Sequence, residues 1–232
     1  MNNFPAPWNL KGRGYILLYH FPKEFVLEKG YVPKELKKHF VGGIGSIMLV
    51  DYQESTAGPY QELLFIPGKF KWQGRKLASI TKIYVSTETS VQNGQINWGI
   101  PKELGNFHFE TLSKDMERIQ VTVGGEIALT ISLHWGKIAF PVHTALLPFP
   151  LLQFMDEQYY YTKFHGSGKG RFAAIEEVFS KETLFPDVSE IKPLAAFRVD
   201  DFRLIFPVAE IKLRQFRSSK IPMAISKAPD KV

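Results

Sequence analysis

The stretch IQVTVGGEIALTI, residues 119–131, decides the fold class of this sequence. On each side of Gly124-Gly125, bulky apolar residues alternate with polar or small ones, as expected for strands that bury one face. Two glycines between such runs are typical of a tight hairpin turn, because glycine adopts positive φ angles without steric cost. The stretch therefore predicts an antiparallel hairpin within a mainly β protein.

Similar short runs, rich in β-branched and aromatic residues and separated by glycine or proline, recur along the chain. We expect strands at residues 15–19, 44–52, 61–66, 79–86, 107–112, 118–123, 127–133 and 202–206. A short helix is expected at residues 33–38, where Pro33 suits a first turn, while residues 172–179 fit a helix or a strand. The pattern predicts a single antiparallel barrel or barrel-like sandwich over residues 1–232, with few short helices.

Composition excludes several classes of protein. The 232 residues are 44% hydrophobic, which is enough for a sizeable core, and they include no cysteine. Disulfides, cysteine nucleophiles and thiolate metal sites are therefore excluded, and a cytoplasmic location is expected. The N-terminus has no signal-peptide pattern, and the most apolar stretch, residues 138–154, is too short and too interrupted by prolines to cross a membrane as a helix. That apolar stretch instead predicts a homo-oligomer interface.

Charge and motif patterns predict no nucleic-acid partner, metal or cofactor. The formal charge is +6, but the basic residues are scattered apart from clusters at residues 34–38 and 212–220. Nucleic-acid binding favours basic residues gathered on one face with aromatic residues between them. The six histidines lack metal-binding spacing, no Gly-x-Ser-x-Gly motif occurs, and the glycines of residues 166–170 lack the spacing of a phosphate-binding loop.

Lys102 is the strongest candidate for chemistry. It lies in WGIPKELG, residues 98–105, an apolar segment bordered by glycines. An ammonium group is costly to bury, so burial favours the neutral amine, which is a nucleophile toward ketones and aldehydes. We therefore expect a Schiff-base enzyme, although an ordinary loop lysine would show the same local pattern.

Three other residues accompany Lys102 as candidates. Arg13 stands between two glycines at the entry to the first expected strand, and Glu62 begins an apolar strand after a Gly-Pro turn. Tyr84 lies in a strand that precedes the segment of Lys102. Taken singly, each of these residue types in such a place more often has a structural role: a surface arginine, a glutamate at a strand edge and a core tyrosine.

Four motifs in order resemble the acetoacetate decarboxylase family. Residues 94–105 (GQINWGIPKELG) resemble its active-site segment, in which a glycine-led strand ends in Pro-Lys-Lys-Leu-Gly. Residues 12–15 (GRGY) resemble its Asn-Arg-Glu-Tyr start, residues 60–62 (YQE) its Tyr-x-Glu turn, and residues 206–210 (FPVAE) its Leu-Pro-x-Ala-Glu segment. The order and spacing fit across most of the chain, except around residues 150–195.

The resemblance implies a cone-shaped antiparallel β-barrel, usually in a homo-oligomer, that decarboxylates a β-keto acid without a metal or organic cofactor. Lys102 matches the Schiff-base lysine, Arg13 the pocket arginine, and Glu62 the pocket glutamate linked to that arginine. We expect the substrate, a small-molecule keto acid, to contact three further residues, Tyr84, Trp98 and Ile100.

The chain departs from the family pattern at two positions. Glu103 replaces the second lysine of the motif, and Ile100 replaces an aromatic residue. A neighbouring carboxylate favours the ammonium form of a lysine, unless an extended backbone directs the two side chains to opposite faces. Two alternatives therefore stay open: a Schiff-base aldolase or dehydratase acting on a larger keto acid, and a non-catalytic barrel that binds a hydrophobic ligand.

Overall fold

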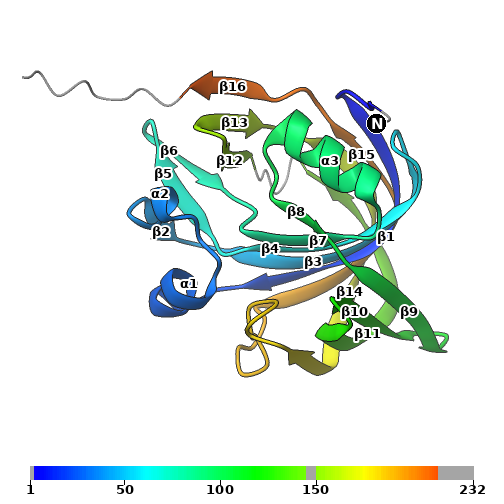
Figure 1. Cartoon of the computed structure of the whole chain (residues 1–232). Coiled ribbons are helices and arrows are strands. Elements are labelled where there is room, and N and C mark those ends of the chain that lie inside the picture. The colour runs from blue at the N-terminus through cyan, green and yellow to red at the C-terminus, as the bar shows by residue number, and fades with distance from the viewer. Residues whose placement is uncertain (1–2, 145–149, 214–232) are drawn as a thin grey trace, which may run out of the picture.

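The computed structural model describes residues 3–144 and 150–213, which form a mainly β structure with a curled ten-stranded sheet (Figure 1). The order of the sheet is β8-β7-β4-β3-β1-β15-β14-β11-β10-β9. Neighbouring strands are antiparallel except β7 and β8. In chain order the strands are β1 (Trp8–Tyr19), β3 (Gly45–Ser55), β4 (Tyr60–Ile66), β7 (Lys82–Val85), β8 (Lys102–Leu104), β9 (Asn106–Ser113), β10 (Met116–Val123), β11 (Glu126–His143), β14 (His165–Ser180) and β15 (Ala195–Phe206).

A smaller six-stranded sheet has the order β16-β13-β12-β6-β5-β2. Its strands are β2 (Phe40–Gly42), β5 (Lys69–Trp72), β6 (Arg75–Ala78), β12 (Leu151–Met155), β13 (Gln158–Thr162) and β16 (Glu210–Leu213). The helices of the described residues are α1 (Lys23–Lys29), α2 (Lys34–Lys37) and α3 (Glu88–Trp98).

The mainly β fold class is confirmed, and the hairpin of residues 119–131 forms as predicted. β10 and β11 pair antiparallel around Gly124 and Gly125, whose φ angles are 59° and 84°. Each of the expected strands overlaps a strand of the structure, although β1 and β11 are much longer than predicted. Residues 172–179 belong to β14, so the strand alternative holds there, and the expected helix at 33–38 is α2. α1 and α3 are not among the expected helices.

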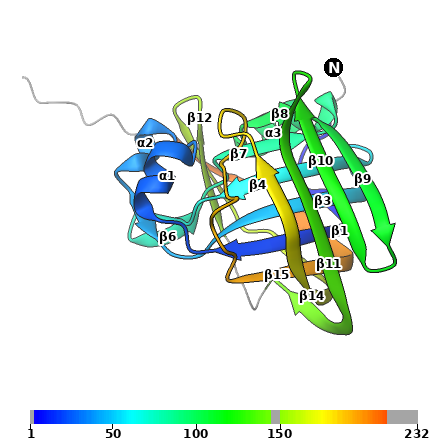
Figure 2. The same ribbon diagram turned by 90° about the horizontal axis from the view of Figure 1, so that it is seen from below.

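The middle of the large sheet separates two apolar regions. Residues alternate between its faces, so that Leu17, Leu49 and Leu63 enter one core while Leu10 and Leu64 enter the other. β9, β10 and β11 lie on one side of the layer formed by β1, β3, β4 and β7 (Figure 2), and α3, β13 and β16 lie on the other (Figure 1). A residue's position along a strand therefore decides which of the two interiors its side chain enters.

Helix α3 delivers the chain to the lysine segment. The Thr87 hydroxyl caps its start by accepting a hydrogen bond from the Ser90 amide, and Gly99, with a φ angle of 59°, ends it in the left-handed conformation. The chain then passes through Pro101 into β8, which runs parallel to β7 with Lys102 beside Ile83. This turn brings the lysine back beneath the helix that precedes it.

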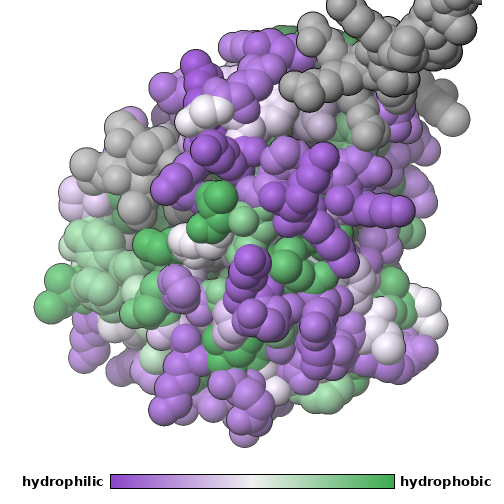
Figure 3. Space-filling model, turned by 90° about the vertical axis from the view of Figure 1, so that its left-hand side faces the viewer, coloured by the Kyte–Doolittle hydropathy of each residue, from purple (hydrophilic) through white to green (hydrophobic). Residues whose placement is uncertain are grey.

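Many of the hydrophilic and charged residues lie on the surface. On the side formed by α1 and α2, hydrophilic residues predominate and hydrophobic residues form patches between them (Figure 3). Lys34, Lys37 and Lys38 are exposed at and after α2, while most of the second basic cluster, residues 214–220, lies outside the described residues. Among the described helices, none combines the length and apolar character that crossing a membrane requires.

Candidate active site

Lys102 is buried against α3. Its side chain is only 4% exposed, although it carries an amine. Gly94 of α3 makes the room: a Cβ atom at this position would lie 2.5 Å from Cδ of Lys102 and 2.8 Å from its Cε. The first glycine of the quoted motif thus permits close contact between the helix and the lysine, because any larger residue would have to displace the side chain.

The Lys102 amine has two polar partners. Its Nζ lies 3.0 Å from Glu62 Oε2 and 3.0 Å from the Ser90 hydroxyl oxygen. The Glu62 side chain is 7% exposed, so the two opposite charges form a buried pair. A buried charge is tolerated when it is paired and hydrogen-bonded, and each member of this pair meets that condition.

Two tyrosines complete the polar group. The Tyr52 hydroxyl donates to Oε1 of Glu62 at 3.2 Å, and the Tyr60 ring lies beneath the ammonium, with its centroid 5.0 Å from Nζ of Lys102. The pKa values of Tyr52 and Tyr60 are well above 10, first because the hydroxyls are buried and second because they face Glu62. Both phenols therefore stay protonated, and Tyr52 holds the carboxylate through the oxygen that Lys102 does not contact.

These groups lie at the wall of a cavity of about 410 Å³. Lys102 and Glu62 contribute to its lining, with Trp8, Trp98 and Ile100 next to them. Most of the remaining lining is aliphatic or aromatic. An apolar pocket with a few polar groups in its wall is the usual arrangement of a small-molecule site, since few polar groups are needed to fix the ligand.

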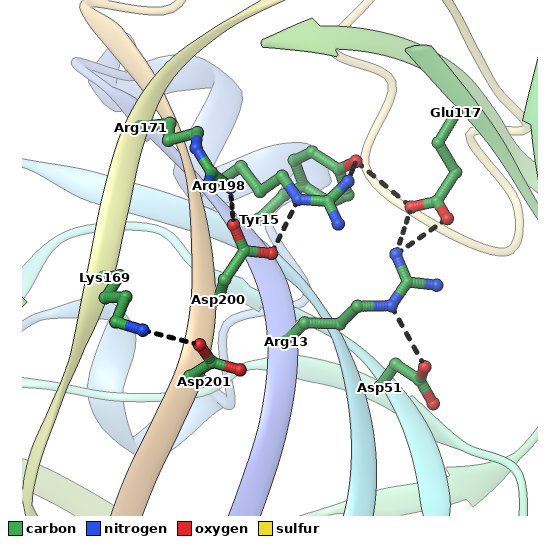
Figure 4. A network of polar contacts seen from close by, with 9 residues as sticks. All are labelled: Arg13, Tyr15, Asp51, Glu117, Lys169, Arg171, Arg198, Asp200 and Asp201. Atoms are coloured by element: carbon green, nitrogen blue, oxygen red, sulfur yellow. Dashed lines mark hydrogen bonds and ion pairs between the residues drawn. The ribbon is translucent and has the colours of Figure 1, made fainter. Parts of the chain in front are cut away.

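Arg13 does not join this group. The Arg13 Nη1 donates to both oxygens of Glu117, at 2.7 and 2.9 Å, and its Nε lies 3.4 Å from Asp51 (Figure 4). Tyr15 also donates to Glu117, and Arg198 donates to the Tyr15 hydroxyl oxygen. The network occupies the face of the sheet opposite Lys102, so the expectation that Arg13 and Glu62 pair in one cavity is wrong.

The comparison with protein families decides the assignment of the chain. The sequence model described as acetoacetate decarboxylase matches residues 5–183, well over half of the chain. The chain belongs to the acetoacetate decarboxylase family. A search among curated protein sequences finds no match.

Solved structures of acetoacetate decarboxylase and related enzymes share the fold. The acetoacetate decarboxylase of Legionella pneumophila is 13% identical, with a TM-score of 0.68 over 91% of this chain and 90% of that one. MppR, an enduracididine biosynthesis enzyme complexed with pyruvate, is 15% identical, with a TM-score of 0.62 over 91% of both chains. An acetoacetate decarboxylase-like enzyme from Sphingomonas wittichii RW1 is 12% identical, with a TM-score of 0.62 over 90% and 93%.

Glu103, which replaces the second lysine of the acetoacetate decarboxylase motif, points away from Lys102. Because β8 is extended, the two side chains leave opposite faces of the strand. The Glu103 carboxylate is 53% exposed and lies 2.6 Å from Nζ of Lys82, which in turn lies over the Tyr84 ring. The carboxylate that contacts Lys102 is therefore Glu62, and the substitution at position 103 leaves the buried amine untouched.

The three expected substrate contacts divide between the two faces. Trp98 and Ile100 line the cavity, and the indole nitrogen of Trp98 donates to the Pro207 carbonyl at 2.6 Å. Tyr84 instead enters the other core, where its hydroxyl donates to the Leu184 carbonyl at 2.7 Å. The expectation that Tyr84 contacts the substrate therefore lacks support from its position, because neighbouring residues of a strand face opposite ways.

Sequence reasoning missed several members of the site. Ser90, Tyr60 and Trp8 approach the lysine, and Tyr52 approaches Glu62. None of these four residues stands next to Lys102 in the sequence. Tyr60 begins the YQE motif, and its place two residues before Glu62 on a strand predicts that both side chains share a face of the sheet. Within the described residues, no group of three or more histidine, aspartate or glutamate side chains could hold a metal ion.

Proposed function

We propose that this protein is a Schiff-base-forming decarboxylase of a β-keto acid, with Lys102 as the nucleophile. The observation that carries the proposal is the Lys102 amine, buried in an apolar cavity and in contact with a carboxylate. Acetoacetate decarboxylase gives the family its name, which favours this reaction over other uses of a buried lysine.

Glu62 prepares the amine for attack. The nucleophile must be unprotonated, and Glu62 Oε2, at 3.0 Å from Nζ, is within reach of its proton. Transfer of the proton turns a pair of buried charges into a pair of neutral groups and removes the cost of desolvating them. The protonated Glu62, oriented by Tyr52, can then give the proton to the hydroxyl group that leaves as water.

The remaining steps depend on the positively charged nitrogen of an iminium ion formed at Lys102. The neutral amine adds to the ketone, and loss of water gives an iminium ion. The bond between the carboxylate carbon and the adjacent methylene breaks, its electron pair moves toward the nitrogen, and carbon dioxide leaves an enamine. Protonation of the enamine carbon and hydrolysis of the iminium release the ketone and restore Lys102.

The surroundings of the lysine support the departure of carbon dioxide. Trp8, Trp98 and Ile100 present apolar surface next to Lys102, while Arg13 is held by carboxylates on the other face. A substrate carboxylate placed here is stabilised little by cationic side chains. Neutral carbon dioxide, in contrast, has no cost of desolvating a charge in the same place. The site therefore favours the charge-dispersed transition state over the bound keto acid.

A Schiff-base aldolase or dehydratase is the second candidate. It is favoured by the fold shared with MppR, which has been solved with pyruvate and with a condensation product of pyruvate and an aldehyde. The alternative of a non-catalytic binding barrel rested on Glu103 lying beside Lys102, and it is weakened because Glu103 faces away from Lys102.

We also propose that the protein forms a homo-oligomer, partly through residues 138–154. Ile138 in this stretch is 82% exposed, and residues 145–149 lie outside the described residues.

Release of carbon dioxide separates the two enzyme classes. The protein is incubated with acetoacetate, and carbon dioxide and acetone are measured with the wild type, Lys102→Ala and Lys82→Ala. Decarboxylation that is lost in Lys102→Ala and kept in Lys82→Ala supports the proposal. Consumption of pyruvate and an aldehyde without release of carbon dioxide from any β-keto acid would favour the aldolase instead.

A further inference from the structure

The cavity is larger than the reaction at Lys102 requires. Its volume of about 410 Å³ lies within the range of roughly 300–1,000 Å³ found for pockets that hold drug-sized ligands. A short keto acid such as acetoacetate occupies only the part next to the lysine and leaves the rest unfilled. The shape and chemistry of the remaining space therefore indicate what else a substrate carries.

One wall is built of side-chain rows that lead away from the carboxylate. Glu62 is paired across β3 with Val50, which is paired with Gly14 of β1. The next row on the same face consists of Leu64, Met48 and Ile16, and a third row contains Ile66 and Leu18. On β4 the wall continues for four residues beyond Glu62, roughly 13 Å at the rise of a strand.

The apolar lining continues across β15, β14 and β11, which follow β1 in the same sheet. Val199 lies beside Gly14 and Phe197 lies beside Ile16, so these two side chains extend the first and second rows. Further apolar lining comes from Phe140 and Val142 of β11, Phe202 of β15 and Leu151 of β12. The cavity thus offers apolar contacts along these rows.

Beyond the buried polar group around Lys102, three polar lining residues lie at the surface of the protein. His143, Ser167 and Arg203 are exposed, and they lie on β11, β14 and β15. Between this rim and the buried pair of Lys102 and Glu62, the rows of Met48 and Leu64 provide no partner for a polar substituent. An uncharged, apolar group is the ligand chemistry that this middle section accepts without a desolvation cost.

We infer that the substrate is a β-keto acid whose ketone carries an unbranched apolar chain, which lies along the rows of Val50, Met48 and Leu64. The inference rests on the proposed function and names the substrate class of that site. The ketone carbon faces Lys102, and the carboxylate lies on the other side of it, among the aromatic residues. Decarboxylation consumes one proton and gives carbon dioxide and a methyl ketone that keeps the whole chain.

The test is the dependence of turnover on chain length. Straight-chain β-keto acids are compared, from acetoacetate upward, by release of carbon dioxide from the wild-type protein. We expect kcat/KM to rise by about three- to fivefold for each added methylene, as burial of one methylene implies, until the chain fills the cavity. A kcat/KM that is constant or falls from acetoacetate onward overturns the inference.

A substitution in the second row tests where the apolar chain of the substrate lies. Met48→Trp fills the second row, and Met48 is only partly buried, so the larger ring has room to adjust. It should lower kcat/KM for long chains at least tenfold more than for acetoacetate and move the optimum to shorter acids. Ile127→Trp, at an exposed position outside the cavity lining, is the matched control and should leave the ratio unchanged.

A binding measurement on the wild-type protein tests the same inference without a variant and without turnover. Straight-chain 1-alkanols form no Schiff base, and Trp8 and Trp98 in the lining report their binding by fluorescence. Affinity should rise by a similar factor per methylene in the wild-type protein, and alkanol affinity independent of length overturns the inference. If no keto acid is decarboxylated or trapped on Lys102, the proposed function fails; if Lys102 reacts without any preference for length, only the chain-binding inference fails.

Discussion

Nζ of Lys102 and Oε2 of Glu62 lie 3.0 Å apart, and both side chains are almost completely withdrawn from solvent. The two residues are 40 positions apart in the sequence and meet because β8 and β4 flank β7 in the sheet. Removing one partner of a buried ion pair leaves the other charge without compensation, which costs more than the pair itself contributes.

We therefore expect the two residues to be coupled energetically. Lys102→Met and Glu62→Gln should each lower the free energy of unfolding, the former by about 3–5 kcal/mol because it strands a carboxylate. The double variant should be less destabilised than the sum of the two, by about 1–3 kcal/mol. Urea unfolding of the four proteins measures this coupling, and effects that add within about 0.5 kcal/mol would show that the contact carries no energy.

Gly94 offers a separate probe of the lysine position. Alanine in place of glycine stabilises a helix interior by about 1 kcal/mol, but here its Cβ would meet Cδ and Cε of Lys102. Since a lysine side chain is flexible, Gly94→Ala should fold and yet displace the amine, lowering kcat at least tenfold. Gly136→Ala is the control, because its Cβ would meet nothing closer than 3.7 Å. Full activity of Gly94→Ala would mean that the observed lysine position is not needed.

The two charged residues carried over with Lys102 should behave differently on substitution. Glu62→Gln removes the carboxylate proposed to accept the proton of Lys102 and should lower kcat by about 10²–10⁴. Arg13→Met removes donors from Glu117 and should lower stability by about 1.5–3 kcal/mol while kcat changes only a few fold. Turnover and thermal unfolding are measured for both variants. A loss of turnover in folded Arg13→Met that equals that of Glu62→Gln would give Arg13 the catalytic role that the resemblance implies.

Alkaline pH should destabilise the protein through its buried tyrosines. The pKa values of Tyr52 and Tyr60 are raised in the folded state by burial and then by Glu62. Above about pH 10 the unfolded chain releases these phenolic protons and the folded protein does not, so unfolding is favoured. The stabilising difference is complete below pH 10 and disappears as pH rises through the folded pKa values.

Absorbance near 295 nm, which follows tyrosinate, measures this difference. The folded protein should ionise fewer than its nine tyrosines at pH 11, and the rest should ionise together with unfolding. Tyr52→Phe should reduce the loss of stability between pH 10 and 12. Ionisation of every tyrosine near pH 10 in the folded protein would contradict the burial of Tyr52 and Tyr60.

The fold and half of the site were accessible from the sequence. Strand alternation and the Gly124-Gly125 turn indicated a mainly β fold, because side-chain period and turn chemistry are local properties. α3 was missed because Asn93 and Gly94 weaken its pattern, although Thr87 and Gly99 are recognisable caps. The extended β8 segment correctly predicted that Glu103 could face away from Lys102.

The errors at Arg13 and Tyr84 have one physical cause. On a strand, a shift of one residue moves a side chain to the other face of the sheet. A residue that is close in sequence to a site residue can therefore enter the apolar region on the opposite face. Gly14, not Arg13, is the residue of β1 that lies beside Val50 in the cavity wall. On β7 it is Ile83, beside Leu64, and not Tyr84 that lines the cavity. The register of Gly14 with Val50 depends on a pairing of distant strands that local patterns do not specify.

Reductive trapping tests the central claim most directly. The protein is incubated with acetoacetate and borohydride, its mass is measured, and the modified peptide is mapped. We predict one added ketone-derived group on Lys102, absent from Lys102→Ala. Lys82, the other lysine that is buried among the described residues, should stay unmodified. A folded protein that gains no group at Lys102 with acetoacetate or with longer keto acids, or that is modified equally at exposed lysines, would contradict Schiff-base catalysis.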